Sequence, residues 1–194
     1  MSPRPPRQTV VVAAFAALVG IGTGAWFFNR TLPEPAAPPA MRSAPAGVGI
    51  GDVMPSIALP DIQGQMVDLA RFGGRPLLIN VWASWCGPCV EEMPALAAFA
   101  AAQPADGVQV LGLALDTPDG VRDFLARVPV GYPIVLDTPS PDDASVRLGN
   151  AQGLLPYSVL VGADGRIVKQ KLGPFGPGEI ETWTAAANPP AAGR

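Results

Sequence analysis

Apolar residues in this chain fall into short runs whose spacing changes along the sequence. The run Pro76–Trp82 is apolar except for Asn80, and Val108–Leu115 has the same character. Continuous apolar runs of this length predict strands that are covered on both faces of a sheet. Between them, Val90–Ala102 is rich in Ala, Glu, Leu and Met, which are strong helix formers. The order strand, helix, strand predicts an α/β domain.

Shorter elements continue this alternation toward the C-terminus. Asp116 or Thr117 can cap a helix that begins at Pro118, because a side-chain oxygen satisfies a free N–H at the helix start. Pro133–Asp137 predicts a short strand. The capping-box-like stretch Ser140–Asp143 then predicts the start of a short helix.

Two segments have the pattern of β-hairpins. Ile57–Leu69 predicts a hairpin ahead of the first buried strand, and Tyr157–Val161 and Arg166–Leu172 flank the turn sequence Gly-Ala-Asp-Gly. Pro177–Ala187 predicts a closing helix. The elements together predict an α/β fold in which a mixed β-sheet is flanked by helices and preceded by an N-terminal β-hairpin.

The longest apolar run lies before this domain. Val10–Phe28 carries no charge, and a helix needs about 20 such residues to span a bilayer. Arg4 and Arg7 precede it, as expected when the N-terminus stays in the cytoplasm. A cleaved signal peptide is the alternative, but its apolar region has about 7–15 residues and ends at small residues. This run ends in Trp-Phe-Phe, so an uncleaved signal anchor is favoured.

The anchor defines the other segments of the chain. Residues 1–9 are expected in the cytoplasm, 10–28 in the membrane, and 29–49 in a Pro-rich linker that cannot bury a core. Residues 50–188 have the size of one domain, and 189–194 form a frayed tail. The domain is therefore expected outside the cytoplasm.

Composition excludes several classes of function. The formal net charge is −3 and the cations are scattered, so no basic patch favours nucleic acid. The chain has no histidine, which excludes His-ligated copper or haem and a Cys/His nucleophile pair. Zinc usually takes four ligands dominated by Cys and His, and this chain offers two cysteines.

The two cysteines, Cys86 and Cys89, stand in the segment Trp-Cys-Gly-Pro-Cys. A structural disulfide gains stability by closing a long loop, and this pair closes almost none. A redox centre fits better, because Pro88 suits a first helical turn whose free N–H groups and dipole would stabilise a Cys86 thiolate. Cys89 lies one turn later, where it can resolve a mixed disulfide. Pro94 should break the helix that follows.

These residues carry a resemblance to a known family. The segment from Trp85 to Cys89 is identical to the active-site segment of thioredoxins, and Glu92 with Pro94 follow as C-x-x-E-x-P. The wider pattern resembles the TlpA/ResA/CcmG group of membrane-anchored thiol-disulfide oxidoreductases, over residues 50 to 185.

The resemblance implies an architecture and a location. The fold would be thioredoxin-like, with the N-terminal hairpin and a central insertion around Val108–Leu115 and its helix. The redox-active disulfide Cys86–Cys89 would act without a bound cofactor or metal. The protein would be a single-pass protein of a bacterial inner membrane with its catalytic domain in the periplasm.

The resemblance also implies a substrate-binding surface. Pro156 matches the family's cis-proline, and Leu155 before it would offer backbone groups to an extended substrate segment. Trp85 either packs at the rim of the domain or docks partners beside Cys86. The candidate substrate-binding residues are Trp85, Gly87, Pro88, Leu155 and Pro156.

Glu92 has two interpretations. It is either a solvated helix glutamate, or a half-buried carboxylate that relays the proton of Cys89, three positions before it. The family's motif carries Glu here. Asn80 stands where cytosolic thioredoxins carry a buried Asp, and an amide cannot shuttle a proton, which favours Glu92 as the acid–base group.

The expected function is reduction of disulfides in exported client proteins, with Cys86 attacking and Cys89 resolving. In the family, a membrane thiol transporter supplies the electrons. A thioredoxin dedicated to cytochrome c maturation is an alternative, although such members often carry Glu where this chain has Tyr157. A peroxiredoxin-like peroxidase would need Thr and Pro just before Cys86, and a non-catalytic adaptor would not need both cysteines.

Overall fold

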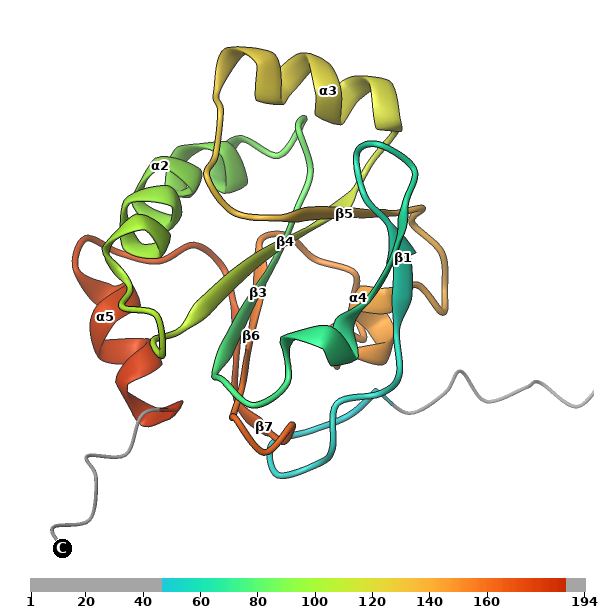
Figure 1. Cartoon of the computed structure of the whole chain (residues 1–194). Helices are drawn as coiled ribbons and strands as arrows, with labels where there is room; N and C mark the ends of the chain where they lie inside the picture. The colour runs from blue at the N-terminus through green and yellow to red at the C-terminus, as the bar shows by residue number, and fades with distance from the viewer. Residues whose placement is uncertain (1–46, 188–194) are drawn as a thin grey trace, which may run out of the picture. The chain divides into compact units, whose positions relative to one another are not determined.

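A five-stranded mixed sheet forms the centre of the computed structural model, which describes residues 47–187 (Figure 1). Its strands are β3 (Leu77–Trp82), β4 (Gln109–Leu115), β5 (Ile134–Asp137), β6 (Tyr157–Val161) and β7 (Ile167–Leu172). They lie in the order β5-β4-β3-β6-β7. The pairs β3–β4 and β4–β5 are parallel, whereas β3–β6 and β6–β7 are antiparallel. The predicted mixed sheet is confirmed.

Helices and the N-terminal hairpin cover opposite faces of this sheet (Figure 1). On one face lie α2 (Gly87–Ala102), α3 (Pro118–Arg127), α5 (Glu179–Thr184) and the short η2 (Ala185–Ala187). On the other lie β1 (Ala58–Pro60), β2 (Met66–Asp68), η1 (Leu69–Phe72) and α4 (Ala144–Arg147). Strands β1 and β2 pair antiparallel, so the predicted N-terminal hairpin is present, and the segment interpreted as a central insertion forms β4 and α3.

Strand β3 is covered on both faces, which explains its almost continuous apolar sequence. All of its residues are buried: Leu78 and Trp82 pack under the helices, while Leu77, Ile79 and Val81 pack toward the hairpin. Successive side chains of a strand point to opposite faces, so a strand with both faces covered needs a continuous apolar run. Asn80 is the polar exception, and its side chain belongs to the site described below.

The expected helix break at Pro94 is wrong. Helix α2 continues through Pro94 to Ala102. Proline removes one helical N–H and leaves the carbonyl of Val90 without its partner, but Pro94 lies on the exposed side of the helix, where water can satisfy that carbonyl. Buried Met93 and Leu96 on either side of it hold the helix against the sheet.

The predicted start of α3 is confirmed, and that of α4 differs slightly. Thr117 caps α3, because its hydroxyl accepts from Gly120 N, whereas Asp116 has another role. Helix α4 is capped by Asp143 rather than opened at Ser140: Asp143 accepts from the backbone N–H groups of Ser145 and Val146.

The predicted anchor at 10–28, the linker up to residue 46 and the tail 189–194 lie outside the described residues. Between residues 47 and 187, none of the helices is both long and apolar enough to cross a bilayer.

Candidate active site

The two cysteines form a disulfide at the start of α2. Cys86 is the N-cap residue, Cys89 lies in the first turn, and their Cα atoms are 5.3 Å apart. Helix α2 begins at Gly87 with Pro88 in its first turn, as predicted, and no side chain caps it. The free N–H groups of the helix start are therefore available to a charge at Cys86. Cys86 is 7% exposed and Cys89 is fully buried. Of the two cysteines, Cys86 is therefore the one that solvent can reach.

A cis-proline loop lies at the end of the sheet where β3 leads into α2, because Tyr157, which follows Pro156, pairs with Val81 near the end of β3. The Leu155–Pro156 peptide bond is cis, as expected. Pro156 is buried, and half-buried Leu155 packs against the core cluster that contains both cysteines. The loop leads directly into β6, so the sheet holds it in position.

Exposed apolar side chains flank the disulfide. Trp85 precedes Cys86 and is 69% exposed, Leu154 precedes the cis-proline loop, and Leu172 pairs with Tyr157 at the start of β6. Gly87 and Pro88 are also exposed. Trp85, Leu154 and Leu172 thus form an exposed apolar rim at this end of the sheet. Of the candidate substrate-binding residues, Trp85, Gly87 and Pro88 are exposed there, whereas Leu155 is half-buried and Pro156 is buried. Exposed apolar groups gathered around a reactive centre are typical of a surface that binds another protein.

Glu92 is buried and held from two sides. Asn80 Nδ2 on β3 donates to Glu92 Oε1 over 2.8 Å, and the backbone N–H of Phe175 donates to Glu92 Oε2 over 2.9 Å. Asn80 Nδ2 also donates to Ser158 Oγ on β6. Of the two interpretations of Glu92, a solvated helix glutamate is wrong, because 5% of the residue is exposed. The carboxylate is more deeply buried than the expected half-buried group.

Burial raises the pKa of Glu92 above its ordinary value. The hydrogen bonds from Phe175 and Asn80 and the charge of Lys171 oppose this shift, while the charge of Glu179 adds to it. A carboxyl group with a raised pKa can hold a proton closer to neutral pH than a solvated one, as an acid–base group must. Glu92 and Cys89 lie one turn apart on α2 and are both buried.

Comparisons with known proteins agree with this geometry. Residues 50–186 match the family described as Redoxin. The chain belongs to the Redoxin family.

Relatives of this Redoxin domain are thiol-disulfide oxidoreductases and thioredoxin-like proteins. ResA from Bacillus thuringiensis (strain Al Hakam), a thiol-disulfide oxidoreductase, is 26% identical over 141 residues, which cover 72% of this chain and 79% of ResA. A thioredoxin-related protein from Neisseria meningitidis serogroup B is 31% identical, with a TM-score of 0.57 over 67% of this chain and 96% of that protein. A Chlorobium tepidum protein assigned as thiol:disulfide interchange protein DsbE is 29% identical, with a TM-score of 0.59 over 72% and 96%.

The fold and these relatives make the protein a TlpA/ResA/CcmG-like member of the thioredoxin superfamily and a thiol-disulfide oxidoreductase. Such enzymes use a cysteine disulfide rather than a cofactor. In the described part of the Redoxin domain, no cluster of three or more Cys, Asp and Glu residues is arranged to hold a metal ion.

The sequence did not reveal two contacts of the Redoxin site. One is the donor to Glu92 from Phe175, which lies in a Gly- and Pro-rich turn with no local signal of this role. The other is Asp116, one of the two candidate caps of α3, whose Oδ2 accepts from both the N–H and the hydroxyl of Ser84 at 2.8 and 2.6 Å. The contact between Asp116 and Ser84 could have been predicted from the order of the strands. Ser84 follows β3 and Asp116 follows β4, and these neighbouring parallel strands end at the same edge of the sheet.

Asp116 fixes the segment that leads into the cysteines. Burial raises its pKa, but hydrogen bonds from Ser84 and Thr117 outweigh burial, and the pKa of Asp116 is lowered. The carboxylate is therefore charged at neutral pH and anchors Ser84, two residues before Cys86.

Tyr157 follows the cis-proline but faces away from the active site. Its side chain is buried in the cluster under the hairpin and α4, and its hydroxyl donates to the carbonyl of Leu148. Burial raises the pKa of Tyr157 to about 12, so the hydroxyl stays protonated. Tyr157 is therefore a core residue that supports the cis-proline loop from the hairpin face of the sheet.

Proposed function

We propose that this protein reduces disulfides in proteins outside the cytoplasm, with Cys86 as the attacking thiolate and Cys89 as the resolving thiol. The observation that carries the proposal is the Cys86–Cys89 disulfide at the uncapped start of α2, at the end of the sheet that also carries the cis peptide of Pro156. The helix start favours a thiolate at Cys86, and the apolar rim gives a client protein a surface to bind.

The exchange proceeds in two steps from the reduced enzyme. The Cys86 thiolate attacks one sulfur of a client disulfide, which forms a mixed disulfide and releases the other client sulfur as a thiolate. The Cys89 sulfur then attacks the Cys86 sulfur, which forms the Cys86–Cys89 disulfide and releases the second client sulfur. Two electrons pass from the enzyme to the client.

Glu92 supplies the acid–base chemistry of the second step. Cys89 is buried and must lose its proton before it attacks, and Glu92 is the carboxylate one helical turn away. Asn80 holds Glu92 but cannot take the proton itself.

The direction of electron flow in this proposal rests on the resemblance to thioredoxins. Gly87 and Pro88 match thioredoxin, whose potential of about −270 mV is reducing. Net reduction outside the cytoplasm needs an electron supply, and a membrane thiol transporter is the donor of this proposal. The client class is disulfide-containing exported proteins.

The test of the activity is insulin reduction by the full-length protein in detergent with dithiothreitol. We expect the wild type to accelerate precipitation of the insulin B chain, whereas Cys86→Ser should not exceed dithiothreitol alone, because it lacks the nucleophile. A wild type no faster than Cys86→Ser would contradict the proposal and favour a non-catalytic adaptor.

The proposal also places the domain on the periplasmic side of a bacterial inner membrane, held by a signal anchor at Val10–Phe28. Support comes from the length of this uncharged run and the arginines before it. We expect the mature protein to begin near Met1 and to sediment with membranes. N-terminal sequencing that starts within residues 29–49 would show cleavage and overturn the anchor, but not export.

A further inference from the structure

Three polar side chains form a row across the sheet beneath α2. In the strand register, Asn80 on β3 is opposite Ser158 on β6, and Ser158 is opposite Lys171 on β7. Residues directly opposite each other on neighbouring strands point to the same face. Asn80 and Glu92 are joined by a hydrogen bond, so Lys171 lies on the face of the sheet that carries Glu92.

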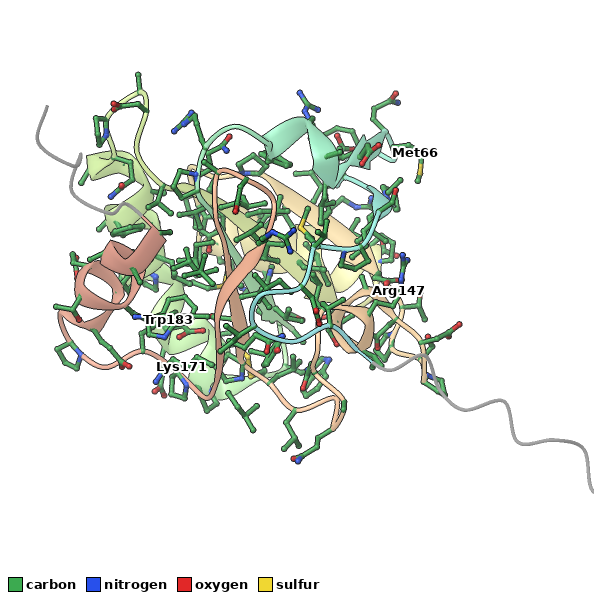
Figure 2. All side chains as sticks on the ribbon, turned by 90° about the horizontal axis from the view of Figure 1, so that it is seen from below. Met66, Arg147, Lys171 and Trp183 are labelled. Atoms are coloured by element: carbon green, nitrogen blue, oxygen red, sulfur yellow. A yellow bond between two sulfur atoms is a disulfide. The ribbon has the colours of Figure 1, made fainter. Side chains whose placement is uncertain are left out.

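The turn after β7 contacts both Glu92 and Lys171. Phe175 in this turn donates its N–H to Glu92, and the Lys171 Nζ lies 5.6 Å from the centre of the Phe175 ring. The ring of Phe175 also packs edge-on against Trp183 of α5. Figure 2 shows Lys171 and Trp183 on the α5 side of the molecule, away from Met66 and Arg147.

Glu179 holds the Lys171 side chain in this position. Lys171 Nζ and Glu179 Oε1 are 2.9 Å apart, and Glu179 Oε2 accepts from the backbone N–H of Gly176 over 2.7 Å. Glu179 therefore ties the ammonium to the same turn that binds Glu92. The side chain of Lys171 is 22% exposed, so its charge is partly shielded from solvent.

We propose that Lys171 is a positioning residue for thiol-disulfide exchange: held by Glu179 over Phe175, its ammonium favours the charged form of the Glu92 carboxylate. This inference rests on the proposed function, in which Glu92 takes the proton of Cys89. Lys171 touches neither sulfur and acts through Glu92.

Two charged groups and one titratable hydroxyl act on or respond to the charge of Glu92. Lys171 on β7 lowers the pKa of Glu92, and Glu179 on α5 raises it. Tyr132, before β5, is neutral because burial and the charge of Glu92 raise its pKa. Asn80 and Ser158 complete the surroundings and carry no charge. Lys171 is therefore the cation that opposes the cost of burying Glu92.

A purely structural role for Lys171 makes a different prediction. If Lys171 only fastens the turn, breaking the ion pair from either side should move the Glu92 titration in the same direction. If its charge acts on Glu92, Lys171→Met should raise the titration midpoint of Glu92, and Glu179→Gln should lower it. Methionine keeps the apolar contact with Phe175, and glutamine keeps an acceptor for the turn.

The experiment follows the Glu92 side-chain carboxyl carbon by NMR in the oxidised full-length protein in detergent, with Glu92→Gln to assign the signal. We expect an upward shift of the midpoint in Lys171→Met, a downward shift in Glu179→Gln, and the wild-type value in Lys171→Arg. The matched control is Lys169→Met. Lys169 lies on the same strand and face, but its Nζ donates to the carbonyl of Trp183, and its charge is not among those that shift Glu92.

A second readout connects the titration to catalysis. Glu92 must be ionised to accept the proton of Cys89, so the rate of resolution should rise with pH through the Glu92 midpoint. The acid limb of the pH–rate profile should therefore move to higher pH in Lys171→Met and to lower pH in Glu179→Gln.

The outcomes separate this inference from the proposed function. Midpoint shifts of the same sign in both variants, or no shift in Lys171→Met, would overturn the role of Lys171 even if the protein reduces insulin. Shifts of opposite sign in a protein that does not reduce insulin would refute the proposed function and leave the coupling between Lys171 and Glu92 in place.

Discussion

In a Cys89→Ser variant, we expect the mixed disulfide between Cys86 and its client to accumulate in cells as a band that reductant removes. The chain has two cysteines, so no second sulfur remains to release the client. External thiols must replace an intramolecular attack whose effective concentration is far higher. The lifetime of the adduct should therefore increase by about 100-fold or more.

Cys86→Ser is the matched control, and it should trap far less client, because Cys89 is fully buried. Mass spectrometry of the trapped species identifies both clients and the electron donor, since each exchanges through Cys86. A cytochrome c or its assembly factor would indicate the maturation branch, and assorted exported proteins would indicate a general reductase. Equal trapping by both variants would reverse the roles assigned to the two sulfurs.

Glu92→Gln should slow resolution by about 100-fold, as expected on removal of a general base, while attack by Cys86 stays close to the wild-type rate. The variant should fold, because glutamine has the size of glutamate and its oxygen can still accept from the N–H of Phe175. Asn80 can turn its amide toward the new NH₂ group, since its Oδ1 has no hydrogen-bond partner among residues 47–187.

Reduction of a small aromatic disulfide such as DTNB separates the two steps. Attack releases the first coloured thiolate and resolution releases the second, so Glu92→Gln should delay the second release. The control is Glu91→Gln, which changes an exposed carboxylate on the same helix and should leave both phases unchanged. Equal slowing of both phases by Glu92→Gln would remove Glu92 from the resolving step.

The redox pair and the alternation of elements were readable from sequence because both are local. The Cys86–Cys89 spacing places two sulfurs one helical turn apart, and apolar runs identify buried strands without any tertiary information. The surroundings of Glu92 are not local. Its donor Phe175 lies 83 positions away, and its backbone N–H carries no side-chain signature.

Pro94 and Asp116 show how tertiary contacts override local rules. The intrinsic cost of proline in a helix predicted a break, but packing of α2 against the sheet outweighs that cost. Asp116 and Thr117 were both candidate caps of α3; Thr117 caps the helix, and the carboxylate of Asp116 binds Ser84, 32 positions earlier. In both cases the deciding partner comes from another element, which sequence spacing alone does not identify.

The segment before the sheet also pairs with its edges, which protects the domain from self-association. The strands at the two ends of the sheet are β5 and β7, and unpaired strand edges are templates for pairing with other chains. Asp61 bridges to Val135 on β5, and Val53 bridges to Arg166 beside β7. Residues 53–61 thus pair with both edges of the sheet. A version of the protein trimmed to begin after the hairpin would expose both edges and be prone to aggregate.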